Sequence, residues 1–386
     1  MIQVAIMGHG TVGSGVYEVF EMNARQIART VGEPVAVKYV LDLRDFSNLP
    51  YADKFVTDFA VIENDPEIKI VAEVMGGVGA AYAFTKRCLA AGKSVCTSNK
   101  ELVATHGEEL LALAAEHNVN YLFEASVGGG IPVIRPMLQC LAANQIEEIC
   151  GILNGTTNYI LTEMIHKGVS FDDALAQAQA LGYAEKDPTA DVEGHDACRK
   201  ICILSDLAFG DKFDPDAVSC EGITKITLED VALAESLGYV IKLIGRAKRA
   251  ENGKVYAFVA PHLVSKSSPL ASVESVFNGI AVTGNAVGEV MFYGQGAGKL
   301  ATASAVVADM MDAAAHAEKR RAISWGDGAQ NLLLPLDTLE SAWYVRGSVP
   351  AALAAHTVDG AAVTVPMTAG ALQEALPQAQ GAMRVL

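Results

Sequence analysis

Short apolar runs alternate with longer amphipathic stretches over the first third of the chain. The apolar runs predict buried strands at residues 2–7, 35–41, 69–75, 93–97 and 119–123. The stretches between them predict helices at residues 13–29, 80–91 and 101–117. Because strands that alternate with helices imply right-handed crossovers, this part of the chain is expected to form a parallel sheet.

The pattern changes after residue 123. Helices are expected at residues 132–143, 159–166, 171–181 and 195–209, and strands at 148–153, 240–247 and 255–264. A glycine-rich run at 294–298 leads into an alanine-rich helix at 300–320. We therefore predict an α/β chain whose first domain spans residues 1–125 and is completed by a returning helix at 297–322. A second, α+β domain is expected at 126–296, and a short tail at 335–386.

The composition is that of a well-buried globular protein. Charged side chains make up 19% of the 386 residues, and the mean hydropathy is +0.25, which excludes a largely disordered chain. The net charge of −16 argues against nucleic acid and anionic membranes as partners. No apolar run is long enough to cross a bilayer, and the first residues read as a strand and not as a signal peptide, so a cytoplasmic location is expected.

Seven cysteines give no sign of a disulfide framework or of a zinc site. Most of them lie in apolar stretches, and no Cys-x-x-Cys pair occurs. Reduced, buried thiols are therefore expected.

A Gly-x-Gly-x-x-Gly sequence follows the first predicted strand and opens the first predicted helix. It contains Gly8, Gly10, Thr11, Val12 and Gly13. Gly8 permits a tight turn, Gly10 lets a pyrophosphate approach the backbone, and Gly13 lets helix and strand pack closely. The helix N-terminus supplies amides for the phosphates. This context predicts a Rossmann-type dinucleotide site, and the alternative is a glycine turn that serves packing alone.

Two charged residues that follow the second predicted strand favour different cofactors. Asp42 stands where an acid would bind the ribose hydroxyls of NAD, whereas Arg44 could bind the 2′-phosphate of NADP or lie in solvent. The cofactor prediction is therefore NAD(P).

A densely charged segment, residues 178–200, runs into an apolar helix. Within it Asp196 and Lys200 stand four residues apart and share one face of that helix. A lysine can take the proton of an alcohol when burial lowers its pKa toward neutrality. From the spacing alone, a surface ion pair is the simpler explanation.

With these motifs in place, the chain resembles homoserine dehydrogenases over residues 1 to about 320. Five segments carry the resemblance: 8–13, 97–100 (Thr-Ser-Asn-Lys), 123–132 (Phe-Glu-Ala-Ser-Val-Gly-Gly-Gly-Ile-Pro), 151–160 (Gly-Ile-Leu-Asn-Gly-Thr-Thr-Asn-Tyr-Ile) and 178–200. The resemblance implies NAD(P)-dependent interconversion of L-homoserine and L-aspartate 4-semialdehyde, in threonine, methionine and isoleucine biosynthesis. It also implies a homodimer and a fold with a Rossmann-type parallel sheet domain plus an α+β substrate and dimerisation domain.

The resemblance assigns roles to three charged residues. Lys200 is implied to transfer the proton, Asp196 to belong to the substrate pocket, and Lys100 to be a second active-site lysine that also lies near the cofactor. Lys100 follows a predicted strand at the carboxyl edge of the sheet, where ligands of such sheets bind. The alternative for Lys100 is a surface lysine at the start of a helix.

The same resemblance implies that Glu185 and the backbone around Gly182 contact the substrate ammonium group. Asp191 lies on the same turn and is either another substrate contact or a turn carboxylate. Thr157 or Asn158 is expected to cap the helix that follows this part of the 151–160 segment.

A metal site is also implied, at the glycine-rich loop 127–130. Its ligands would be Glu124 and the backbone of Val127, Gly129 and Ile131. A carboxylate with carbonyl oxygens suits a hard cation, and the resemblance implies a monovalent one, sodium; the alternative is a loop that binds nothing. Gly298 is implied to place its amide near the nicotinamide, or else only to begin the returning helix.

Residues 341–346 resemble the first strand of an ACT-type regulatory domain, and 350–355 the start of its helix. The residues that remain are too few for a complete ACT-type domain, so this tail is interpreted as a short remnant. Little or no inhibition by threonine is expected.

Two other functions compete with this interpretation. A nucleotide sensor that has lost catalysis is disfavoured because Lys100, Asp196 and Lys200 are all present. An aldehyde dehydrogenase needs a nucleophilic cysteine beside a base, and no loop cysteine with a histidine is visible.

Overall fold

The computed structural model describes residues 1–386, which form two compact units. The first unit contains Met1–Cys140 and Gln295–Asp327, and the second contains Leu141–Gly294 and Gly328–Leu386. Each unit is built around its own β-sheet. None of the helices combines the length and the apolar content that a membrane-spanning segment requires.

The first sheet has six parallel strands in the order β3-β2-β1-β4-β5-β6. They are β1 (Ile2–Met7), β2 (Val35–Leu41), β3 (Phe55–Val56), β4 (Ile68–Glu73), β5 (Ser94–Thr97) and β6 (Tyr121–Leu122). The order reverses between β1 and β4, which is the place where open parallel sheets bind their ligands beyond the carboxyl ends of the strands. The predicted Rossmann-type sheet is thereby confirmed.

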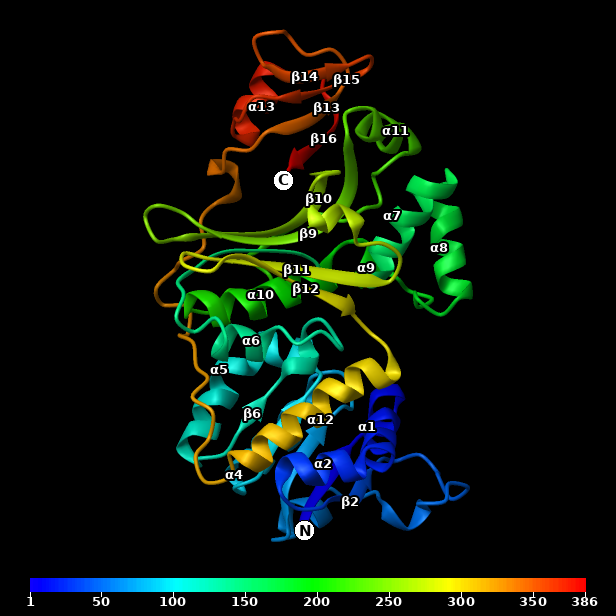
Figure 1. Cartoon of the computed structure of the whole chain (residues 1–386), viewed down its shortest axis with the longest axis vertical. Coiled ribbons are helices and arrows are strands. Elements are labelled where there is room, and N and C mark those ends of the chain that lie inside the picture. Colours follow the sequence, from blue (N-terminus) through cyan, green and yellow to red (C-terminus); the bar gives the residue numbers. More distant parts are fainter. The chain divides into compact units, whose positions relative to one another are not determined.

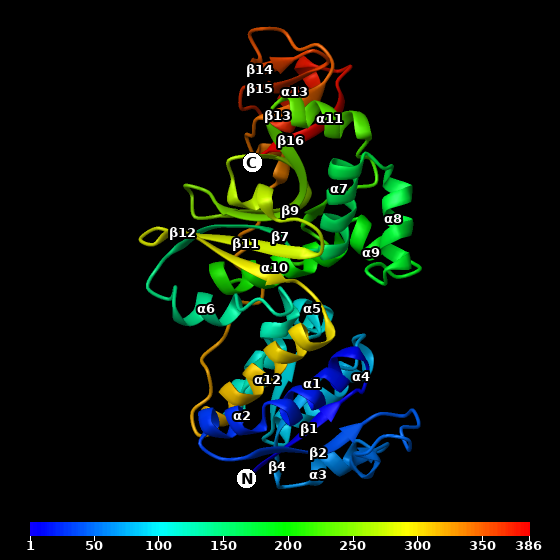
Figure 2. The ribbon, with the colours of Figure 1, turned by 45° about the vertical axis from the view of Figure 1, so that its right-hand side comes forward.

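The helices of the first unit are α1 (Thr11–Met22), α2 (Ala24–Val31), α3 (Ala60–Asn64), α4 (Gly79–Ala90), α5 (Lys100–Glu116), α6 (Ile134–Gln139) and α12 (Lys299–Ala315). The prediction of one helix over 13–29 was wrong, because the chain breaks at Asn23, which leaves helical geometry and belongs to a residue type that favours helix ends. Helix α12 lies beside α1 although nearly the whole chain separates them (Figures 1 and 2). Gly15 permits this approach, since a Cβ there would lie 2.7 Å from the Lys299 carbonyl oxygen.

The second sheet has ten strands in the order β12-β11-β7-β9-β10-β16-β13-β15-β14, with β8 beside β10. They are β7 (Ile146–Ile152), β8 (Ser219–Cys220), β9 (Tyr239–Arg249), β10 (Val255–Ser265), β11 (Phe277–Gly284), β12 (Gly288–Gln295), β13 (Trp343–Arg346), β14 (Ala354–Val358), β15 (Ala361–Thr364) and β16 (Gln380–Val385). The expected antiparallel pair is β9 with β10, whereas the patterns did not predict β11 and β12.

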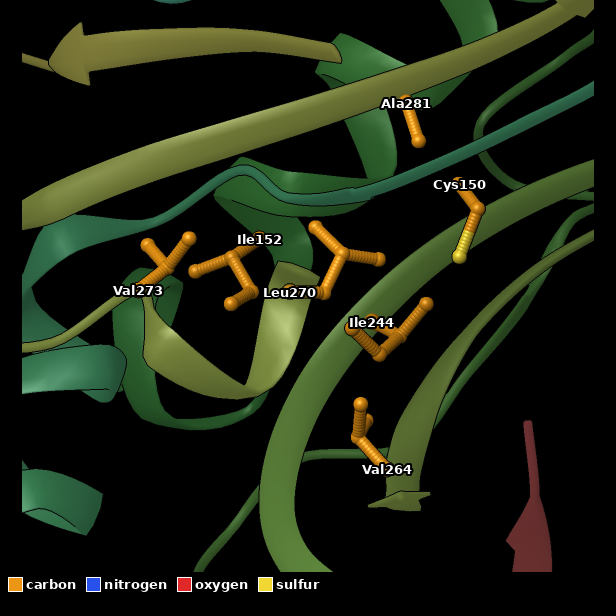
Figure 3. Packing of buried hydrophobic residues seen from close by; sticks show 7 residues of the cluster. All are labelled: Cys150, Ile152, Ile244, Val264, Leu270, Val273 and Ala281. Carbon is orange, nitrogen blue, oxygen red and sulfur yellow. The ribbon is translucent and has the colours of Figure 1, made fainter. Parts of the chain in front are cut away.

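Both faces of this sheet are covered. Helix α10 (His195–Phe209) packs against one face, where Gly245 of β9 leaves room for Leu153 and Ile201. The neighbouring Ile244 points the other way, as alternation along a strand requires, into the apolar cluster of Figure 3. The remaining helices are α7 (Gly155–Lys167), α8 (Phe171–Ala180), α9 (Thr189–Val192), α11 (Leu228–Ser236) and α13 (Ala369–Ala375).

The tail extends the second sheet. Its first strand, expected at 341–346, is β13, but the helix expected at 350–355 was wrong, because the chain turns there and enters β14. Pairing with β15 overrides the helix preference of this alanine-rich stretch. The tail is anchored by β16, which pairs in parallel with β10. The Arg384 guanidinium lies 5.5 Å from the Phe258 ring and 4.2 Å from the Trp343 ring.

Candidate active site

The glycine loop after β1 has the geometry that its sequence predicts. Gly8 has φ +98°, a left-handed conformation that favours glycine. A Cβ on Gly13 would overlap the carbonyl oxygen of Gly8 and lie 2.9 Å from its carbon, so only glycine lets α1 pack this closely on β1. Nothing lies within 4 Å of a Cβ on Gly10, and no side chain caps the helix that begins after it. The amides of Thr11 and Val12 at this uncapped N-terminus therefore suit an anionic ligand.

A pocket of about 520 Å³ opens beside this loop, at the carboxyl ends of β1, β2 and β4. Its walls include Gly10, Asp42, Met75 and Phe84. The pocket lies where the strand order reverses, so it fits the adenosine half of a dinucleotide.

Asp42 and Arg44 form one ion pair at the rim of this pocket. Asp42 accepts hydrogen bonds from the His9 amide at 2.8 Å and from the Arg44 guanidinium at 3.0 and 2.7 Å. The Arg44 hydrogen bonds hold the pKa of the Asp42 carboxyl well below its usual range. The acid that would bind NAD and the base that would bind NADP are thus paired with each other, and the cofactor prediction stays NAD(P).

Lys100 is half-buried at the start of α5, on the carboxyl edge of the first sheet, as predicted. The helix is capped by Asn99, whose Oδ1 accepts the Leu102 amide at 3.1 Å. Sequence reasoning missed a buried carboxylate at the same edge of the sheet. Glu73, the last residue of β4, accepts a hydrogen bond from Thr97 Oγ1 at 2.7 Å, and burial raises its pKa. Its position at the end of a buried strand was the signal that could have revealed it.

Lys200 is buried inside the second unit. Its side chain is 10% exposed and that of Asp196 is 7% exposed. Lys200 Nζ donates to Asp196 Oδ2 at 2.7 Å and to the Leu153 carbonyl at 2.8 Å. The surface ion pair that the spacing favoured is therefore wrong, because α10 presents this face to the sheet.

The structure brings Asp191 to the same pair through Asn154. Asn154 Nδ2 donates to Asp191 Oδ1 at 2.7 Å and to Asp196 Oδ2 at 2.8 Å. Asn154 also caps α7, so the predicted caps, Thr157 and Asn158, were wrong. The Asn158 amide instead donates to three backbone carbonyls between residues 273 and 277.

Glu185 and Gly182 both form hydrogen bonds with Gln179. Glu185 is exposed, and its carbonyl accepts Gln179 Nε2 at 3.0 Å. Gly182 is exposed with φ +77°, and its amide donates to the Gln179 carbonyl at 3.1 Å. Their contact with a substrate remains a prediction.

The Glu124 carboxylate is already engaged. It accepts the backbone amides of Val133 and Ile134 at 2.7 and 2.8 Å and that of Arg135 at 2.7 Å, which closes the start of α6. Within residues 1–386 no group of three or more histidine, cysteine, aspartate or glutamate side chains is placed to hold a metal ion. Any cation here would therefore depend mainly on backbone oxygens.

Two glycine-rich runs meet in the first unit. A Cβ on Gly129 would lie 2.5 Å from the Gly296 carbonyl oxygen, and the Gly130 amide donates to the Gln295 carbonyl at 3.1 Å. Val127 and Ile131, on either side of the first run, are buried. Gly298 begins α12 with φ +131° and is exposed.

The buried cysteines are poorly suited to act as a catalytic thiol. All seven are free, and only Cys140 is exposed. Burial raises the pKa of the Cys88 and Cys150 thiols to about 12. Contact with Cys202 and burial raise the pKa of Cys198 to about 12. Thiols with such pKa values are poor nucleophiles.

Residues 8–124 match the family model described as the NAD binding domain of homoserine dehydrogenase, and residues 132–311 match the homoserine dehydrogenase model. The chain is 41% identical to the homoserine dehydrogenase of Neisseria gonorrhoeae, over 89% of this chain and 81% of that protein. It is 45% identical to the enzyme of Synechocystis, over 81% and 73% respectively.

Solved structures of homoserine dehydrogenases are also similar to this chain. A homoserine dehydrogenase from Thiobacillus denitrificans has a TM-score of 0.87 at 35% identity, over 100% of this chain and 98% of that one. A hyperthermophilic archaeal homoserine dehydrogenase in complex with NADPH has a TM-score of 0.69 at 29% identity, over 81% and 97%. The chain therefore belongs to the homoserine dehydrogenase family and is an NAD(P)-dependent oxidoreductase.

Proposed function

We propose that the chain interconverts L-homoserine and L-aspartate 4-semialdehyde with Lys200 as the group that moves the proton. The observation that carries this proposal is the buried ammonium group of Lys200, held between the Asp196 carboxylate and the Leu153 carbonyl. Two fixed acceptors orient the amine, and such orientation is what a proton-transfer group needs. The reaction belongs to amino-acid biosynthesis, and we assign it to the route toward threonine, methionine and isoleucine.

The bound nicotinamide supplies the exchange of hydride with the carbon that bears the hydroxyl group. The protein must handle the hydroxyl proton. In the oxidation direction neutral Lys200 Nζ accepts this proton, and in the reduction direction the ammonium form returns it to the aldehyde oxygen. Asp196 holds the amine and compensates the positive charge that it gains.

The other polar ends of homoserine need charged partners. Asp191 and Asp196 suit the ammonium group because both carboxylates accept a hydrogen bond from the side-chain amide of Asn154 and therefore lie close together. Glu185 and the Gly182 backbone are additional contacts by family resemblance. Lys100, at the sheet edge, suits the substrate carboxylate or the carbonyl oxygen.

The test is a steady-state assay of L-homoserine with NAD and then with NADP, read from the absorbance of the reduced cofactor. Lys200→Met should lower kcat by at least about 100-fold, while the affinity for the cofactor is kept. Lys167→Met is the matched control, because Lys167 forms the same type of i,i+4 pair with Glu163 but its side chain is 59% exposed. Full turnover in Lys200→Met would remove the assignment.

A monovalent cation and a homodimer complete the proposal. The cation would be held by Glu124 and by the backbone oxygens of Val127, Gly129 and Ile131, where Gly128 and Gly129 have positive φ. Replacing sodium by a bulky organic cation should lower the melting temperature; an unchanged value would argue against the site. Light scattering should give twice the chain mass, and a monomeric mass would refute the dimer.

A further inference from the structure

Asn154 is locked in one orientation by the residues around it. It is 5% exposed and stands between the end of β7 and the start of α7. Its Oδ1 accepts the Thr157 amide at 2.8 Å and the Thr157 hydroxyl at 3.0 Å. The donor side of the amide must therefore face the opposite way, toward Asp191 and Asp196.

Each amide proton of Asn154 is used by a different carboxylate. One bond goes to Asp191 Oδ1 and the other to Asp196 Oδ2, at 2.7 and 2.8 Å. Asp196 Oδ2 also accepts Lys200 Nζ. The adjacent residue, Leu153, holds the same amine through its carbonyl. Leu153 thus binds the lysine of the buried ion pair, and Asn154 binds its aspartate. Asn154 also sets the position of the second carboxylate, that of Asp191.

We propose that Asn154 is a positioning residue that fixes the separation of Asp191 and Asp196 and thereby makes the site selective for a substrate with a primary ammonium group. Two carboxylates would repel each other if nothing joined them, and a neutral donor with two protons joins them without neutralising either. An ammonium group donates up to three hydrogen bonds, so a pair of carboxylates at a set distance recognises it better than one. This inference rests on the proposed function.

The side-chain bonds of Asn154 can be separated from its capping role. Asn154→Ser keeps an oxygen that caps α7 but is too short to reach both carboxylates. Asn154→Asp keeps the size and the cap. Its carboxylate only accepts hydrogen bonds, so it would face the Asp191 and Asp196 carboxylates without a donor between them. In both variants the KM for L-homoserine should rise roughly 10- to 100-fold, the range for lost hydrogen bonds to charged groups. The KM for the cofactor, which the first unit binds, should not change.

A second measurement reports on the lysine. Without the Asn154 donors, Asp196 becomes a stronger partner for Lys200, so the acidic limb of the kcat profile for oxidation should move to higher pH. A residue that only caps a helix would not shift this limb. Ser170→Ala is the matched control, because Ser170 caps α8 in the same way, through the Asp173 amide, and lies on the surface. This control should leave the homoserine KM and the pH profile unchanged.

The outcomes separate the two proposals. If wild-type protein fails to oxidise homoserine, the proposed function fails. If wild-type protein is active and Asn154→Ser has a homoserine KM within about threefold of it, the positioning role is overturned. If neither variant folds, Asp191→Asn is the decisive variant, because it removes the second carboxylate and leaves the cap. It should raise the homoserine KM over the same range, and an unchanged KM would overturn the role.

Discussion

Gly10→Ala and Gly13→Ala add the same methyl group at two places in the cofactor loop, with different structural consequences. At Gly13 the methyl would overlap the Gly8 carbonyl oxygen and lie 3.2 Å from Val74 Cγ2. The obstruction is backbone, so α1 must move away from β1. At Gly10 nothing lies within 4 Å, and φ is −79°, which alanine adopts freely.

The magnitudes follow from these distances. Forcing a methyl into packed backbone destabilises a protein by about 1–3 kcal/mol or more, which lowers the melting temperature of a unit of this size by about 3–10 °C. Gly10→Ala loses at most about 1 kcal/mol, because glycine is the better N-cap. Both variants should bind NADPH about 10- to 100-fold more weakly, the effect of losing a hydrogen bond to a charged phosphate.

Calorimetry and cofactor titration distinguish the two effects. Gly13→Ala should lose stability and affinity together, whereas Gly10→Ala should lose affinity with little loss of stability. Gly370→Ala in α13 is the control, since it meets no neighbour within 4 Å and has no positive φ. It should leave binding unchanged. If Gly10→Ala binds NADPH as tightly as wild type, the pyrophosphate does not lie against Gly10 and the interpretation of this loop is refuted.

Three further predictions concern the thiols, the pH response and the tail. Alkylation of native protein should label Cys140, the exposed thiol, without changing turnover, and parallel loss of activity would favour a cysteine nucleophile. Burial lowers the pKa of His262 to about 3, below its unfolded value, so its stabilising contribution is present above the unfolded pKa and is lost as the pH falls. Between about pH 6.5 and pH 5 the wild type should therefore lose about 2 kcal/mol more stability than His262→Phe, as measured by denaturant unfolding, and equal losses would contradict this. L-Threonine should leave the steady-state rate unchanged, because the tail strands are already paired within the second sheet, and strong inhibition would refute this expectation.

Local patterns predicted much of the fold. Five of the six strands of the first sheet could be read from the alternation of apolar runs, whereas β3, α3 and the break between α1 and α2 were not predicted. Helix α10 has the bounds that were predicted for it. The patterns failed where strand pairing decides the conformation. The 350–355 stretch favours a helix by composition, but it turns and enters β14, which pairs with the next strand along the chain, β15. Strand β11 was missed as well, and it pairs with β7 from a distant part of the chain.

Some features of the candidate site were likewise predictable from the sequence, and others were not. The glycine loop was predictable, because positive φ and close approach are properties of the local backbone. Asp196 and Lys200 were predictable as neighbours because they lie one helical turn apart, but their burial was not. The role of Asn154 was not predictable either, since 42 residues separate it from Asp196.

The sequence alone determined the conformations that depend on near neighbours: the turn that faces the cofactor phosphates and the helix face that carries an acid and a base. Only the tertiary structure decided which charges lose their water and what replaces it. That outcome depends on the Leu153 carbonyl and the Asn154 amide, which follow β7 and form hydrogen bonds with Lys200 and Asp196 of α10. A charge leaves water only where the folded chain supplies other partners, and residues far apart in the chain supply them here.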